Sequence, residues 1–266
     1  MSTTPETADG RIAIVATIRA SWKLVREHPR ESILPALLIQ VPVTTVVALV
    51  TMFFLFTTYS DTEFRLLNEL SGDDPGGLIF LLVVGAAVQA LFAQVAHGAT
   101  VVGIAGVLTG KPGGVTAALD AAFTRMGALL LMAVVLIAGA GLLFLTIIGA
   151  LIVPFLAIRC ALSYEALMIE KISVGAAFRR SLALTRGHIL RMLGALLLGV
   201  LSALPAFIFV FFIGSAVAGG RTQQIVANTL VTIAQAFVLA PVYAVLTALT
   251  TIIYFKLRES DARRPV

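Results

Sequence analysis

The sequence of 266 residues has few of the residues that a water-soluble protein needs. Charged residues make up only 12% of it and hydrophobic residues 59%, whereas about 25% of the residues in a soluble domain are charged. Its mean hydropathy of +1.02 is too high for one buried core, because a soluble chain must also cover a polar surface. The scarcity of charge excludes a soluble globular protein and indicates a chain that lies mostly in lipid.

Catalytic and metal-binding motifs are also missing. The single cysteine, Cys160, excludes an intrachain disulfide and a cysteine-rich zinc site. The sequence contains no HExxH, no GxSxG and no acidic cluster with metal-ligand spacing. The segment 106–112, GVLTGKP, is one residue short of a phosphate-binding loop and has Pro112 where that loop needs Ser or Thr. We therefore expect no enzyme, no catalytic residue, no metal and no cofactor.

Long apolar runs are what the chain does contain. They reach 20 residues or more without strict alternation, which predicts membrane-spanning helices and not a β-barrel. We expect an all-α polytopic bundle of about six transmembrane helices. A single membrane domain, 11–258, would follow a disordered tail, 1–10, and precede a cytoplasmic tail, 259–266. The expected spans are about 33–59, 78–107, 127–146, 150–169, 192–217 and 226–255.

Short amphipathic helices are expected before the first, third and fifth spans. The first, 11–29, places Val15, Trp22 and Val25 on an apolar face beside a basic stripe. This pattern is typical of a helix in an anionic membrane interface, although a helix packed on a cytosolic partner gives the same pattern. The candidate contacts to lipid headgroups are Arg19, Lys23, Arg26, Arg179, Arg180 and Arg186.

An internal repeat connects two of these helices. The segment Ile18–His28 aligns without a gap with Phe178–His188, and Val115–Arg125 is a weaker third copy. Each copy precedes an odd-numbered span. The hypothesis is three units, each a surface helix followed by a two-span hairpin; the alternative is chance similarity among short amphipathic helices.

The basic residues predict the orientation of the chain. With six spans and both termini in the cytoplasm, sixteen of the nineteen Lys and Arg residues lie on the cytoplasmic side. Only Arg65 and Arg221 lie outside, and Arg159 lies within a span. This asymmetry follows the positive-inside rule of a bacterial inner-membrane protein. The net charge of +5 therefore indicates membrane topology, and no nucleic-acid partner is expected.

Arg159 is the most informative polar residue. A charge near the centre of a span costs at least about 2.5–3.5 kcal/mol, so it should face the bundle interior and have a partner. Gln89 and Gln235 are the expected partners, and His97 is a further intramembrane candidate. The same residues either form a ligand site in a polar cavity or make structural hydrogen bonds between helices.

The segment 154–191 resembles a known family. It enters a span through Pro154, has Arg159 in that span, and then continues with the pattern Ala-x-x-x-Ser-x-x-Leu-Thr-Arg-Gly, at 177–187. This pattern is similar to the membrane domain of membrane-bound glycerophosphoryl diester phosphodiesterases. The catalytic barrel of those enzymes, with its His-Arg-Gly start, has no counterpart here, so the resemblance implies the membrane domain without the hydrolase.

These observations favour a non-enzymatic scaffold or accessory membrane domain that contacts anionic lipid. A transporter or flippase of a lipid or small amphiphile, using Arg159 in a central cavity, is the alternative. The expected partners are membrane lipids, and a membrane-protein partner or a second copy of the chain is left open.

Overall fold

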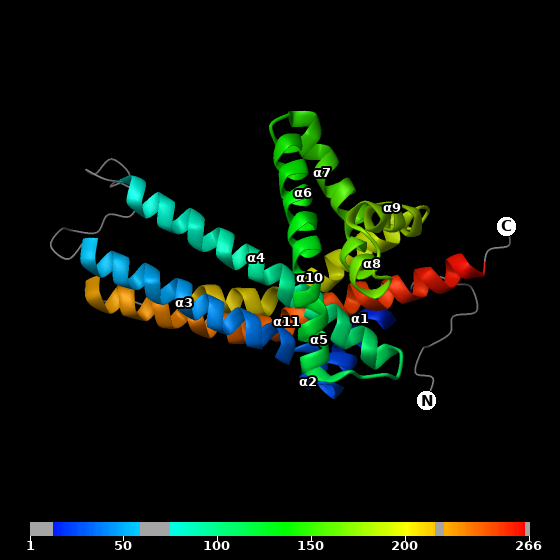
Figure 1. Cartoon of the computed structure of the whole chain (residues 1–266), viewed down its shortest axis with the longest axis horizontal. Coiled ribbons are helices and arrows are strands. Elements are labelled where there is room, and N and C mark those ends of the chain that lie inside the picture. Colours follow the sequence, from blue (N-terminus) through cyan, green and yellow to red (C-terminus); the bar gives the residue numbers. More distant parts are fainter. Residues whose placement is uncertain (1–12, 59–74, 216–220, 264–266) are drawn as a thin grey trace.

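The computed structural model describes residues 13–58, 75–215 and 221–263, and every regular element in these ranges is an α-helix (Figure 1). Six helical segments within them are long and apolar enough to cross a membrane. The predicted fold class, an all-α polytopic membrane bundle, is confirmed. The helices are α1 Ile14–Glu27, α2 Pro29–Ser32, α3 Leu34–Thr58, α4 Pro75–Leu108, α5 Gly114–Thr124, α6 Met126–Phe144, α7 Ile147–Cys160, α8 Ser163–Ile169, α9 Val174–Thr185, α10 Ile189–Ser215 and α11 Arg221–Ala262.

The expected fourth span, about 150–169, corresponds to the apolar segment Ile152–Ile169, but two helices form it and not one. Helix α7 ends at Cys160 and α8 begins at Ser163. In an unbroken helix the carbonyl of Arg159 would accept from the backbone N–H of Ser163. Here it accepts from the Ser181 hydroxyl of α9 at 2.7 Å. A side chain from a neighbouring helix thus takes up the carbonyl where the helix breaks.

Helix α11 is longer than predicted. Its 42 residues extend about 63 Å at 1.5 Å per residue, roughly twice the 30 Å thickness of the hydrocarbon core. It continues through 259–262, which were expected to belong to a tail. Part of α11 must therefore extend beyond the bilayer.

The element order is the one that the three-unit hypothesis requires. Helices α1, α5 and α9 each precede a pair of long helices: α3 and α4, α6 and α7, and α10 and α11. Each of the three also packs on the second long helix of another unit: α1 on α11, α5 on α4, and α9 on α7 and its continuation α8. The three units therefore contact one another in a closed cycle.

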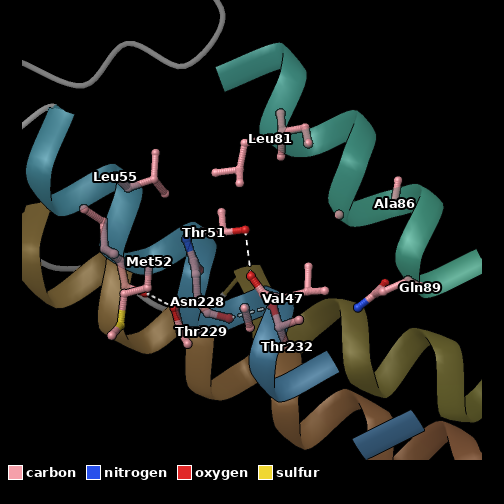
Figure 2. A pocket seen from close by; sticks show the side chains of 14 residues that line it. Val47, Thr51, Met52, Leu55, Leu81, Ala86, Gln89, Asn228, Thr229 and Thr232 are labelled. Carbon is pink, nitrogen blue, oxygen red and sulfur yellow. Dashed lines mark hydrogen bonds between the residues drawn. The ribbon is translucent and has the colours of Figure 1, made fainter. Parts of the chain in front are cut away.

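The long helices diverge away from the surface helices. In Figure 1, α3, α4 and the first part of α11 extend to one side, whereas α6 and α7 form a hairpin that points in another direction. A groove remains between α3, α4 and α11 (Figure 2). We call the segments 79–84 of α4, 134–143 of α6 and 226–237 of α11 the splayed ends; most of their large apolar side chains are exposed.

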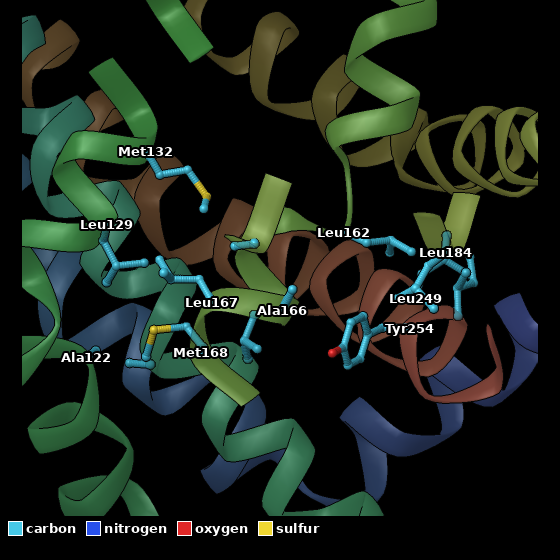
Figure 3. Packing of buried hydrophobic residues seen from close by; sticks show 14 of the residues in the cluster. Ala122, Leu129, Met132, Leu162, Ala166, Leu167, Met168, Leu184, Leu249 and Tyr254 are labelled. Carbon is cyan, nitrogen blue, oxygen red and sulfur yellow. The ribbon is translucent and has the colours of Figure 1, made fainter. Parts of the chain in front are cut away.

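The opposite ends of these helices form the hydrophobic core. We call the segments 95–104 of α4, 129–133 of α6, 162–168 in and just before α8, and 244–257 of α11 the packed end. Figure 3 shows Leu129, Met132 and Leu167 packed together within it, and each of the three is fully buried. The surface helices α1, α5 and α9 pack around this core, so the packed end holds the six long helices in one body.

Candidate functional site

Polar side chains follow one face of α11 through its apolar sequence. Residues spaced three, four or seven to eight apart share a helix face, and this spacing connects Asn228, Thr232, Gln235, Tyr243, Thr247 and Thr250. Helix α3 supplies Gln40, Thr44 and Thr51, and α4 supplies Gln89 and His97. We call these eleven residues the polar seam.

The outer part of the seam lines the groove. A cavity of about 550 Å³ lies between α3, α4 and α11, and its lining includes Thr51, Gln89 and Asn228 among aliphatic side chains (Figure 2). A second cavity of about 350 Å³ shares Gln89 and Thr232 with it and continues to Tyr243. The groove therefore combines apolar walls with a line of amides and hydroxyls.

Gln89 and Gln235, which were predicted to lie at a similar depth, do line the same cavity. Gln89 Nε2 donates to the Thr44 hydroxyl at 3.4 Å, longer than the usual range for N–H···O bonds. The amide is therefore only weakly bonded within the protein and remains available to another polar group.

His97 lies farther along the seam, toward the packed end. Its Nδ1 is 3.3 Å from the Thr247 hydroxyl, and its ring meets those of Tyr164 and Tyr243 edge-on, with centroids 5.1 and 5.7 Å away. Because Tyr243 also lines the second cavity, the polar contacts continue from the groove to His97.

Arg159 does not join these residues, and its expected partners, Gln89 and Gln235, are not its partners. It is near the end of α7 and faces α9, where its Nη2 donates to the Leu182 carbonyl at 3.5 Å; its guanidinium is 5.8 Å from the centre of the Phe155 ring. Its Nε has no hydrogen-bond partner among the described residues. The physical reason is that α7 packs on α6, α9 and α10, so Arg159 meets α9 and not the seam between α3, α4 and α11.

Glu165 is a buried acid that the sequence reasoning passed over. Its exposed fraction is 0%, and neither carboxylate oxygen has a hydrogen-bond partner among the described residues. The hydroxyl of Ser163, also fully buried, is likewise without a partner there. An acidic residue within the apolar run 150–169 is the signal in the sequence that could have found it.

The basic face of α1 is exposed. Arg19, Lys23 and Arg26 all face outward, next to Val15 and Trp22, which are 66% and 41% exposed. Helix α1 buries Thr17, Ser21 and Val25 instead, so the expected apolar face containing Val15, Trp22 and Val25 is divided. Val25 faces the protein, whereas Val15 and Trp22 face outward with the cations. Arg179 on α9 is also exposed, and so is Arg186, which directly follows α9.

Arg180 has partners within the protein. Its Nε donates to Glu170 at 3.2 Å and its Nη1 to Asp261 at 2.8 Å. Partial burial lowers the pKa of Arg180, but hydrogen bonds and charge from Asp261 and Glu170 outweigh it and raise the pKa. Glu170 also accepts from the Tyr254 hydroxyl at 2.5 Å and lies 3.9 Å from Arg258. This cluster ties α9 to the end of α11, so Arg180 is less free than Arg179 to contact a headgroup.

No protein-family model matches the chain, and neither curated proteins nor solved structures give a match. Within the described ranges, no group of three or more His, Cys, Asp or Glu side chains is placed to hold a metal ion. The function must therefore be argued from the geometry of this chain.

Proposed function

We propose that the chain is a non-enzymatic multi-pass protein of the bacterial inner membrane, with both termini in the cytoplasm. It acts as a scaffold or accessory membrane domain whose surface helices bind anionic lipid. The observation that carries this proposal is the outward face of α1, which combines exposed Val15 and Trp22 with exposed cations.

The composition of that face favours a membrane interface over water or a protein partner. A bilayer interface is apolar on its hydrocarbon side and anionic at its headgroups, so it suits a helix face that carries both apolar and basic side chains. Arg19, Lys23 and Arg26 would each contribute about 1 kcal/mol near an anionic bilayer. The opposite face of α1 already packs on α10 and α11, so the outward face is the one left for lipid.

The contacts among the basic segments support a single cytoplasmic side. Arg125 donates to the carbonyls of Leu167, Lys171 and Ile172, and Lys256 donates to the hydroxyl of Thr17 at 3.0 Å. Segments that the charge asymmetry assigns to one side thus meet at one end of the molecule. The resemblance to the phosphodiesterase membrane domain fits this role, with a membrane-protein partner or a second copy in place of the missing barrel.

The single tryptophan, Trp22, provides a direct test. In nanodiscs that contain anionic phosphatidylglycerol, lipids brominated near the glycerol end of their acyl chains should quench Trp22 fluorescence, and aqueous iodide should quench it little. The triple variant R19Q/K23Q/R26Q should lose the difference between anionic and zwitterionic discs, whereas the control K111Q, also at an exposed lysine, should keep it. Strong quenching by iodide with none by brominated lipid would refute the proposal.

A second candidate function is supported by the groove. Its volume of about 550 Å³ and its mixed lining suit an amphiphile, which places apolar chains against Leu81 and a polar group near Gln89. Arg159 has no part in this version of the transporter hypothesis.

Native mass spectrometry of the purified chain should find a lipid retained by the wild type and by L230F, which changes an exposed side chain of the same helix. The double variant N228L/T232L should lose that lipid; equal retention by all three would exclude the groove.

A further inference from the structure

We propose that Glu165 binds one small monovalent cation, H⁺ or Na⁺, at the inner end of the polar seam. This inference concerns the packed end, and it does not depend on whether α1 binds lipid or the groove holds an amphiphile.

The environment of Glu165 requires such a ligand. The side chain is fully buried, and neither carboxylate oxygen has a hydrogen-bond partner among the described residues. The neighbouring hydroxyl of Thr250 donates to the Thr247 carbonyl at 3.0 Å instead. An unpaired carboxylate is strongly disfavoured in a protein interior and within a membrane. A bound cation of single charge removes this cost, because it leaves the site neutral.

The groups around Glu165 leave it without a protein cation. Helix α8 packs against α4, α6, α9 and α11. Helix α4 contributes His97, which binds Thr247; α8 contributes Tyr164 and α11 Tyr243. Helix α6 contains no titratable residue. The remaining charged or titratable groups of α9 and of the facing part of α11 have other partners or face outward: Arg179, Arg180, Tyr254, Lys256 and Arg258.

The chemistry of the site suits H⁺ or Na⁺ better than a divalent metal. The oxygen group that lies beside Glu165 is the Thr250 hydroxyl. A divalent ion generally takes several carboxylate or imidazole ligands, and the described residues offer no group of three. The break between α7 and α8 is a further argument, since interrupted membrane helices commonly border sites for Na⁺ or H⁺ in transporters.

The seam supplies a polar route toward this site. Tyr243 lines the second cavity and contacts His97, and Thr247 and Thr250 continue along the same face of α11. Glu165 itself is closed off in this structure, so exchange of the cation with the groove requires a local opening near Tyr243.

Infrared difference spectroscopy on the full chain in nanodiscs tests the proposal. If H⁺ is the ligand, a carbonyl band of a protonated carboxyl should appear and disappear with pH, and it should be absent in E165Q but present in E259Q, a control at an exposed acid. If Na⁺ is the ligand, the carboxylate bands should respond to NaCl but not to choline chloride, again only when Glu165 is present. If no band changes with pH or with Na⁺, or if the same changes occur in E165Q, the proposal is overturned.

A second measurement covers the case in which E165Q does not fold. The thermal midpoint of the wild-type chain is measured across pH and with Na⁺ exchanged for choline. The midpoint should depend on pH or on Na⁺. The variant T250V, which removes a hydroxyl beside the site, should change that dependence. The variant T229V in the groove should not change it. A midpoint with identical pH and Na⁺ dependence in the wild type, T250V and T229V would exclude a bound cation.

Discussion

The packed end and the splayed ends of the same helices are built on different principles. In the packed end, α4 presents Val95, Ala96 and Ala99 to its neighbours and exposes none of them. Toward the start of the same helix, Phe80 and Val83 are 70% and 62% exposed. Both stretches are apolar, so hydrophobicity alone does not separate them.

Small side chains and polar contacts account for the difference. Alanine and glycine allow helices to approach closely, and the packed end adds the carbonyl contacts of Arg125 and the cluster around Glu170. In lipid an exposed Phe80 costs nothing, because hydrocarbon chains are as apolar as the residue. The comparison teaches that the packed end specifies the arrangement of the helices, whereas the splayed ends need only to be apolar.

A bulky side chain at Gly103 should produce the largest effect. A Cβ built at this position lies 2.1 Å from the backbone oxygen of Glu31, so G103L must separate α4 from α2. We expect a loss of more than about 3 kcal/mol, beyond the usual 1–3 kcal/mol of overpacking. The measurement is the yield of monodisperse protein in detergent. Gly139 has no atom within 4 Å of the same added carbon, so G139L should behave like the wild type; equal loss in both would remove the distinction between the two regions.

Truncation of a buried leucine should have the next largest effect. Leu167 of α8 is fully buried where α8 packs on α4 and α6, whereas Leu142 on α6 is 69% exposed. L167A should cost about 2–3 kcal/mol, the lower part of the range for such cavities, because detergent also shelters the unfolded chain. L142A should cost less than about 0.5 kcal/mol. Thermal unfolding followed by circular dichroism measures both, and a comparable loss in L142A would show that the splayed ends also contribute to folding.

The sequence predicted the elements well and their contacts only in part. Apolar run length and charge placement identified six long helices and the surface helix before each odd-numbered span, because these follow from the thickness of a bilayer and the cost of burying charge. Run length and charge placement could not show that the Ser181 hydroxyl donates a hydrogen bond to the Arg159 carbonyl. A contact between residues distant in sequence leaves no local periodicity, so the break at 161–162 remained hidden.

The candidate site was predicted to a similar extent. Gln89, Gln235 and His97 were chosen as polar residues within spans, and all three lie along the polar seam. Arg159 was grouped with them because depth within a span was the only available coordinate, and depth does not reveal which way a side chain faces. The stripe from Asn228 to Thr250 on α11 follows helical spacing, but threonine is common in apolar helices, so its spacing alone does not mark a polar face.

Removal of the charge on Glu170 should have an intermediate effect. Glu170 accepts hydrogen bonds from Tyr254 and Arg180 and lies near Arg258. E170Q leaves two arginines without their carboxylate and should cost about 1–2 kcal/mol, since the carboxylate is mostly buried but the arginines are partly solvated. The thermal midpoint should fall more in low salt than in high salt. A drop equal at both salt concentrations would indicate a packing defect instead of a lost ion pair.

The exposed pair on α1 should show the smallest effect. Lys23 Nζ is 3.8 Å from Glu27 Oε1, and both side chains are more than half exposed, so solvent and salt screen the attraction. E27Q should lower the free energy of unfolding by no more than about 0.3–0.5 kcal/mol, the usual value for an i, i+4 pair. It should also leave Lys23 freer to contact an anionic bilayer, because one fixed negative charge is removed from the basic face. A thermal scan beside E170Q in the same detergent tests the first expectation, and Trp22 quenching in phosphatidylglycerol nanodiscs tests the second. A loss in E27Q as large as that in E170Q would mean that α1 contributes to the packed end through its outward face, contrary to the division between its buried Thr17, Ser21 and Val25 and its exposed cations.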